Sequence, residues 1–196
     1  MARPIDPHRR GDLLRAARAT FAERGFAGAR VADIAAGAGV ATGTVYRYFD
    51  SKEALAAALV DDLFTRLTAE LRPILAPPAD TAPIAATVRA ALAFLAEERD
   101  LLRLLRLELG LNALALYRPA RGPRQFREEL AAQLAAMMER GQLRRYDPVV
   151  LAALLIGLIE WVAEACLIRG NGDLAEYEET VLGLLHRALL PDDVAP

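Results

Sequence analysis

The sequence has little of what several classes of protein require. Among its 196 residues there is one cysteine, Cys166, and there are two histidines, His8 and His186. No disulfide can form within one chain, which favours a reducing compartment such as the cytoplasm. With so few thiols and imidazoles, neither a zinc cluster nor a Cys–His nucleophile pair can be proposed. The sequence therefore predicts no metal, no cofactor and no catalytic residue.

Residues that favour strands are also scarce. Aromatic residues make up 6% of the chain, and alanine and leucine dominate it. Such a mixture is rich in strong helix formers and poor in residues that favour sheets. Apolar residues recur at helical spacing, with glycine, proline and aspartate near the expected ends. An all-α fold of about nine helices is predicted, at residues 8–25, 31–38, 41–48, 50–72, 83–98, 100–109, 125–140, 148–169 and 173–190.

Long hydrophobic runs free of charge are missing as well. The N-terminal stretch "MARPIDPHRRGD" lacks the apolar core of a signal peptide. The longest apolar stretch, residues 151–168, carries the carboxylates of Glu160 and Glu164. Two carboxylates in so short a stretch argue against a membrane span. A soluble protein is expected.

The net charge of −2 conceals an asymmetry along the chain. Residues 1–52 contain nine basic and five acidic residues, a balance of +4, whereas the remainder contains 15 basic and 21 acidic residues, a balance of −6. A basic N-terminal part on an acidic body suggests that the front end meets a polyanion. A charge cluster alone is more often a solvated face, so the residue pattern must decide.

That pattern is the stretch "ADIAAGAGVATGTVYRYF" at residues 32–49, two predicted helices joined by a short glycine-containing turn. This is the sequence form of a helix-turn-helix. On the second helix Val45 and Phe49 point inward, while Gly43 and Arg47 point the opposite way. Arg47 is suited to bridge O6 and N7 of a guanine. The outer face is therefore expected to enter a DNA groove.

The neighbouring hydroxyls and a lysine suit the DNA backbone. Tyr46 and Tyr48 can reach phosphates with their hydroxyls, and Thr42 and Thr44 can donate to phosphates or touch a thymine methyl. Lys52 stands at the start of the fourth predicted helix, where free amides and the helix dipole favour a phosphate. Asp50 and Glu53 resemble a capping box for that helix.

Residues 13–60 resemble the DNA-binding domain of TetR-family transcriptional regulators, which are usually repressors. The matching stretches are "AARATFAERGF", "VADIAAGAGV", "GTVYRYF" and "SKEAL". Two positions depart from the family pattern: Arg30 stands where Ser or Thr commonly caps the second helix, and Ala41 replaces a frequent Ser, leaving Thr42 as the possible cap. The residues assigned to DNA contact are Arg30, Thr42, Gly43, Thr44, Tyr46, Arg47, Tyr48 and Lys52.

The resemblance implies a homodimer on a palindromic operator and an all-α body that binds a small molecule and dimerises through its last two helices. Residues 1–52 then form the DNA-binding domain, with the start of the fourth helix, and residues 53–196 the ligand-binding and dimerisation domain. The expected dimer contacts are Leu154, Gly157, Leu158, Tyr177, Val181, Leu184 and Leu185. A large monomeric core is the competing explanation for these apolar helices.

No family motif marks the ligand site, so it is predicted from residue types alone. An apolar cavity with a carboxylate inside suits a mostly apolar effector that carries a polar or cationic group. The residues expected to line it are Phe94, Leu101, Leu105, Tyr117, Glu160, Trp161 and Glu164. For any single one of these residues, ordinary core packing or a solvated acid is the simpler explanation.

Two other functions compete with that of a ligand-responsive repressor. Gly37, Gly39 and Gly43 approach a dinucleotide-binding fingerprint, but that motif requires a preceding strand, and a helix precedes them here. An enzyme is therefore not expected. The second rival, a DNA-binding regulator without a small-molecule ligand, remains open.

Overall fold

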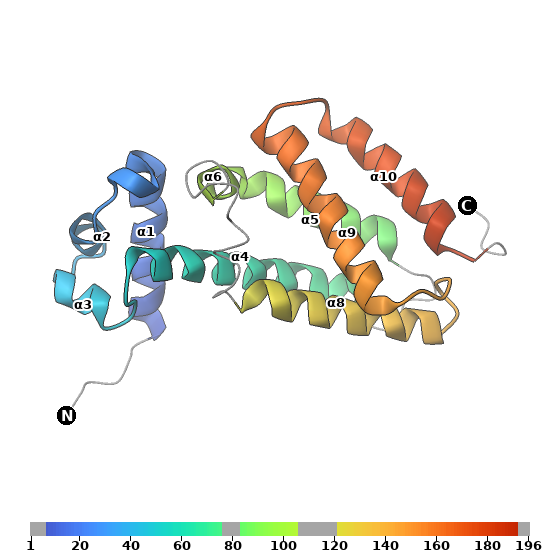
Figure 1. Ribbon diagram of the computed structural model, residues 1–196, viewed down its shortest axis with the longest axis horizontal. Coiled ribbons are helices and arrows are strands. Elements are labelled where there is room, and N and C mark those ends of the chain that lie inside the picture. The colour runs from blue at the N-terminus through green and yellow to red at the C-terminus, as the bar shows by residue number, and fades with distance from the viewer. Residues whose placement is uncertain (1–6, 76–82, 106–120, 192–196) are drawn as a thin grey trace. The chain divides into compact units, whose positions relative to one another are not determined.

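The computed structural model describes residues 7–75, 83–105 and 121–191 (Figure 1). Within these ranges it contains nine α-helices, one π-helix and no strand, which confirms the predicted all-α fold. Tyr117, one of the expected pocket residues, lies outside the described residues. The elements are α1 (Pro7–Gly28), α2 (Val31–Gly37), α3 (Thr42–Tyr46), α4 (Lys52–Leu75), α5 (Ile84–Glu97), α6 (Arg99–Arg103), α8 (Gly122–Glu139), α9 (Pro148–Ala163), the π-helix η2 (Glu164–Ile168) and α10 (Leu174–Leu189).

Several helix ends differ from the prediction for identifiable reasons. Gly25 was expected to end the first helix; with φ 69° and ψ 166° it breaks α1, but helical structure resumes as far as Gly28. Pro73 was expected to lie beyond the fourth helix, yet α4 includes it and reaches Leu75. The predicted helix at 125–140 begins earlier, at Gly122, because Pro123 fits a first helical turn.

The long apolar helix predicted over residues 148–169 consists of α9 followed by η2. Its start is as expected: the Asp147 side chain accepts hydrogen bonds from the amides of Val149 and Val150, and Pro148 occupies the first turn. Near its end the amide of Arg169 donates to the Glu164 carbonyl, five residues back, at 3.0 Å. The last turn is therefore wound more widely than an α-helix.

The chain divides into two compact units. The first comprises Met1–Leu63 with Asp100–Pro123, and the second comprises Phe64–Arg99 with Arg124–Pro196. In the first unit α2 packs on both α1 and α3. Side chains from all four of its N-terminal helices are buried almost completely, among them Leu13, Phe21, Ile34, Val45 and Leu55.

In the second unit α5 packs against both α9 and α10. The core that these helices share with α8 is made of leucine, valine, alanine and methionine side chains. Its members include Val88, Leu92, Leu134, Met137, Val162, Val181, Leu185 and Leu189. A continuous apolar core of this kind holds the helices of the body in place.

Candidate nucleic-acid interface

The turn between α2 and α3 has the geometry expected for a helix-turn-helix. Gly39 adopts φ 65°, a left-handed conformation that favours glycine. The amide of Val40 donates to the Ala35 carbonyl at 2.9 Å, and the amide of Gly39 donates to the Ala36 carbonyl at 3.0 Å. These bonds close the end of α2 and send the chain directly into α3.

Two buried side chains hold α3 in place. With five residues, α3 is too short to be stable alone. Val45 is fully buried and Phe49, just beyond the helix, is 6% exposed. The guanidinium of Arg10 lies 5.4 Å from the centre of the Phe49 ring. The residues predicted to face inward are thus the buried ones. Their burial directs the opposite face of α3 toward solvent.

The opposite face of α3 is open to solvent. Thr42, Gly43, Tyr46 and Arg47 are exposed, while Thr44 and Tyr48 are half-buried. A Cβ added at Gly43 would meet no atom of this chain within 4 Å, so no internal packing requires a glycine there. Ala41 precedes the helix without a side-chain cap, and Thr42 is its first residue rather than its cap.

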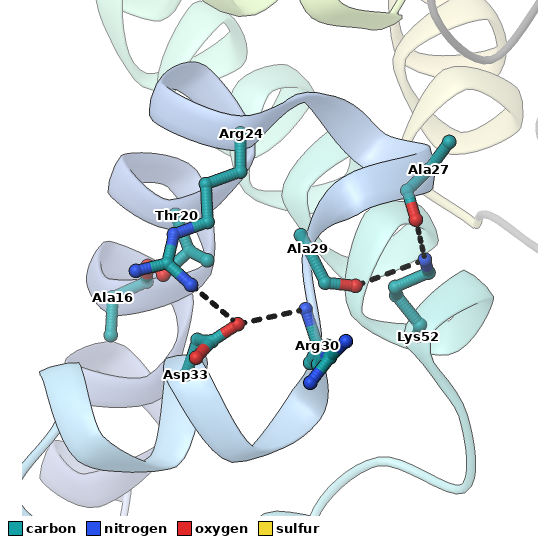
Figure 2. A network of polar contacts seen from close by, with 8 residues as sticks. All are labelled: Ala16, Thr20, Arg24, Ala27, Ala29, Arg30, Asp33 and Lys52. Atoms are coloured by element: carbon teal, nitrogen blue, oxygen red, sulfur yellow. Dashed lines mark hydrogen bonds and ion pairs between the residues drawn. The ribbon is translucent and has the colours of Figure 1, made fainter.

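The start of α2 is held by a carboxylate that the sequence prediction overlooked (Figure 2). Asp33 accepts a hydrogen bond from the amide of Arg30 at 3.3 Å and forms an ion pair with Arg24 at 2.8 Å. Asp33 thereby completes half of a capping box, which compensates for the arginine at the N-cap. The signal in the sequence was an aspartate three residues after the N-cap position. The Arg30 side chain itself stays exposed.

Lys52 has protein partners that the sequence did not indicate. Its ammonium group donates to backbone carbonyls at the end of α1, among them Ala27 and Ala29 (Figure 2). The expected cap of α4 by Asp50 and Glu53 is replaced by Ser51, whose hydroxyl accepts from the Ala54 amide at 3.1 Å.

The residues predicted for the ligand pocket are placed in different surroundings. Phe94 is half-buried, and the Arg66 guanidinium lies 5.7 Å from its ring centre. Trp161 is 58% exposed and packs its ring against Tyr177, with 5.6 Å between ring centres.

Other predicted pocket residues also differ in exposure. Leu101 and Leu105 are buried, and both belong to the first compact unit. Glu160 is half-buried. Glu164 is half-buried too and forms an ion pair with Arg169 at 2.7 Å, so its charge is balanced locally.

The buried acid of the second unit is Glu98, which the sequence analysis did not select. Glu98 is 8% exposed and forms an ion pair with Arg66 of α4 at 2.5 Å. The signal was periodicity: the buried residues Val88, Leu92 and Leu95 of α5 lead by helical steps to position 98. A paired carboxylate in an apolar surround is a candidate polar contact for a ligand.

A groove lies between α4 and α8 within the second unit. Its empty space measures about 430 Å³, a volume that includes open solvent at the mouth of the groove. Its lining mixes apolar side chains with a few polar groups: Thr68, Leu71, Arg72, Leu75, Phe126, Glu129, Leu130 and Gln133. None of these residues was predicted to line a pocket, because their apolar members fit an ordinary helix–helix contact equally well.

The residues expected at a dimer interface fall into two groups. Leu154 and Leu184 are 65% and 53% exposed, and Gly157 is exposed too. Leu158 and Tyr177 are half-buried. In contrast, Val181 and Leu185 are 4% and 8% exposed and belong to the core of the second unit. Those two side chains are therefore unavailable to a partner, since the helix turns them toward α5.

Reactive groups are sparse in the described part of the chain. Burial and, to a lesser extent, the carboxylate of Asp173 raise the pKa of the Cys166 thiol. A raised pKa lowers the thiolate fraction at neutral pH, which disfavours a nucleophilic or redox role. Within the described ranges no three histidine, cysteine or carboxylate side chains gather as metal ligands.

Comparison with known proteins points to one group of relatives. The family model described as "Bacterial regulatory proteins, tetR family" matches residues 13–59, a segment that runs from within α1 through α2 and α3 into α4. An uncharacterized HTH-type transcriptional regulator of Bacillus subtilis (strain 168), YdgC, is 32% identical over 191 residues, which cover 91% of each chain.

Two further relatives are repressors. The HTH-type transcriptional repressor KstR2 of Mycobacterium tuberculosis (strain ATCC 25618 / H37Rv) is 46% identical over 66 residues, 34% of this chain and 33% of that protein. Among solved structures, SmeT, the repressor of the Stenotrophomonas maltophilia multidrug efflux pump SmeDEF, is 26% identical with a TM-score of 0.73, covering 95% of this chain and 93% of its own. SmeT has also been solved as a complex with triclosan.

Proposed function

The chain belongs to the TetR family of bacterial regulatory proteins, and on that premise we propose that it is a cytoplasmic repressor that binds a palindromic operator as a dimer and is released by a small-molecule effector. The observation that carries this proposal is the short helix α3. Buried Val45 and Phe49 anchor it, and its opposite face presents an arginine, hydroxyls and a glycine to solvent.

The exposed face of α3 matches the chemistry of a DNA major groove. Arg47 is assigned to base recognition, since a guanidinium can bind a guanine edge with two hydrogen bonds. Gly43 lets the helix backbone approach the duplex closely. The hydroxyls of Thr42, Thr44, Tyr46 and Tyr48 and the side chain of Arg30 are assigned to phosphates.

The exposed apolar face of the body fits a second copy of the chain. On α9, Val150, Leu154, Gly157 and Trp161 follow one another at helical spacing, and the three with side chains are more than half exposed. Within Pro148–Ile168 an 18-residue window has a mean hydropathy of 2.1, enough in length and composition to cross a membrane, yet only 28% of that window is buried. In a soluble regulator, a partner's helices supply the missing cover.

A dimer also sets the spacing of the two recognition helices. Two copies related by a two-fold axis place their helices in successive major grooves, about 34–36 Å apart, on a palindromic site. Residues 1–52 would then serve DNA binding and residues 53–196 ligand binding and dimerisation.

The effector is proposed to bind in the helical body. The groove between α4 and α8 is lined by four apolar and four polar side chains, and the Arg66–Glu98 pair adds a buried carboxylate to the same unit. SmeT, a repressor of similar structure, has been solved in complex with the small molecule triclosan. We therefore expect a largely apolar effector, whose binding changes the separation of the two α3 helices. Such coupling is typically worth roughly 1–3 kcal/mol.

Fluorescence anisotropy tests the DNA-binding part of the proposal. The chain is titrated into labelled DNA from upstream of its own gene and into random DNA at several salt concentrations. Tight binding to the upstream DNA alone, saturating at a multiple of two chains per site, supports the proposal. Equal and strongly salt-dependent binding to both DNAs contradicts the specific operator.

A thermal-shift screen with a library of apolar compounds tests the effector. A compound that raises the melting temperature and weakens operator binding supports ligand release. If the melting temperature never moves, the second candidate, a DNA-binding regulator without a small-molecule ligand, is favoured.

A further inference from the structure

Lys52 is the only lysine in the chain. Of the 24 basic residues, the other 23 are arginines. The one exception is the first residue of α4, six residues after α3 ends. An exception of this kind indicates that the geometry of the site distinguishes an ammonium from a guanidinium.

The surroundings of Lys52 supply that geometry. Its Nζ donates to the carbonyl of Phe26 at 2.6 Å, of Ala29 at 3.1 Å and of Ala27 at 3.4 Å. It also lies 4.5 Å from the centre of the Phe26 ring. An ammonium has three N–H groups, so three converging carbonyls engage all of them. No donor remains for a phosphate while these contacts hold.

The site favours lysine over arginine for a physical reason. A guanidinium is a planar fork that suits carboxylates and phosphates, whereas the compact ammonium directs its donors toward three separate acceptors. The last carbonyls of a helix have no intrahelical partners and carry the negative end of its dipole. At the start of α4 the same cation opposes its own helix dipole. The presence of a cation at position 52 is therefore explained by the carbonyls at the end of α1 and not by the dipole of α4.

The clamp formed by Lys52 and the carbonyls of residues 26, 27 and 29 joins the two ends of the helix-turn-helix. Residues 30–51, which contain α2 and α3, connect Ala29 to Lys52, and Figure 2 shows Lys52 beside Ala27 and Ala29. Buried Val45 and Phe49 anchor α3 in the core, and the clamp holds the two ends of the segment 30–51 together. Fixing the two ends of a loop reduces the range of orientations of everything between them.

We propose that Lys52 is a positioning residue for DNA recognition: by tying the start of α4 to the end of α1, it sets the orientation in which α3 presents Arg47, and it does so without touching DNA. This inference rests on the proposed DNA-binding function. It differs from the assignment of Lys52 to a phosphate, since a phosphate contact and a clamp respond differently to salt and to substitution.

The first test compares Lys52→Met and Lys52→Arg by anisotropy across a range of salt concentrations, with Arg30→Met as the matched control. A lost phosphate contact lowers the slope of log K against log salt by about 0.9, and we expect this of Arg30→Met. Both Lys52 variants should weaken specific binding roughly tenfold, as for one lost charge-assisted hydrogen bond, with the slope unchanged for Lys52→Met.

The outcomes separate the alternatives. If Lys52→Arg binds as tightly as the original chain and Lys52→Met loses slope, Lys52 contacts a phosphate and the clamp is overturned. If the unaltered chain binds no DNA, both the proposed function and this inference are wrong. Circular dichroism of both variants checks that they fold.

The second test needs no variant. Labelling with ¹⁵N-lysine places a single side-chain ¹⁵Nζ resonance in the spectrum, because there is one lysine. In the free chain we expect slowly exchanging ammonium protons with contacts to the Phe26 ring, and the same chemical shift after DNA is added. Rapidly exchanging protons in the free chain, or a shift of the ¹⁵Nζ resonance on DNA binding, would overturn the inference.

Discussion

At the scale of single residues, α3 has buried side chains that anchor it on one face and exposed polar side chains on the other. Val45 and Phe49 are buried, and the side chain of Arg47 points away from them at an exposed position. A change to Val45 or Phe49 would alter stability and binding together. A change to Arg47 acts at an exposed position and leaves the two buried anchors in place, so its effect on recognition should be measured together with stability.

Replacing Arg47 with alanine should relax sequence preference. If Arg47 binds a guanine edge, its loss costs about 1–3 kcal/mol at one base pair and leaves the other positions unaffected. The measurement is anisotropy against the operator and a set of single-base variants, with Arg30→Ala as a control that weakens all of them evenly. Unchanged discrimination between the operator variants would remove Arg47 from base recognition.

At the scale of elements, the helices of this chain depend on caps of several chemical kinds. Asp147 caps α9 with its carboxylate and Asp173 caps α10, whereas α4 is capped by the hydroxyl of Ser51. α2 lacks a side-chain cap and relies on Asp33 from within its own first turn. A cap of either kind satisfies amides that have no intrahelical partner.

Replacing Asp147 with alanine should lower the free energy of unfolding by about 1 kcal/mol, the usual cost of a lost N-cap. Asp147→Asn keeps an acceptor for the amides of Val149 and Val150 and should cost much less. Urea denaturation of the two variants provides the comparison, with a shifted midpoint and an unchanged slope expected. Equal stability of the two variants would mean that the cap is not what stabilises the start of α9.

At the scale of the whole molecule, the apolar face on α9 predicts that the functional form contains two chains. Leu154 is 65% exposed, although it is a leucine on a helix whose other side is core. Beside it, a Cβ added at Gly157 would meet nothing within 4 Å, which leaves room for a partner helix to approach. A variant that loses the dimer should therefore also bind the operator more weakly.

Replacing Leu154 with glutamate should convert a dimer into a monomer, because an unpaired charge would be buried in an apolar interface. Sedimentation velocity measures the mass, and anisotropy should show weaker operator binding by the same variant. Ala132→Glu, on the exposed side of α8, is the matched control and should leave both unchanged. A Leu154→Glu chain that stays dimeric would place the interface elsewhere.

Much of the fold followed from local pattern, and so did the order of elements in the candidate site. The periodicity of Val31, Ile34 and Ala35 predicted α2, and Gly39 predicted the turn that follows it. Asp147-Pro148 predicted the start of α9. These features depend on residues close together in the chain, so propensity, caps and backbone sterics decide them.

The sequence by itself therefore determined the helical class, the helix-turn-helix and the outward face of α3. Only the tertiary structure decided which side chains of the body are core and which are surface: Val181 and Leu185 are buried whereas Trp161 is exposed, and Glu98 rather than Glu160 or Glu164 is the buried acid. Likewise Lys52 reached carbonyls more than twenty residues away. An amphipathic pattern states that a helix has an apolar face, but what covers that face depends on segments distant in sequence.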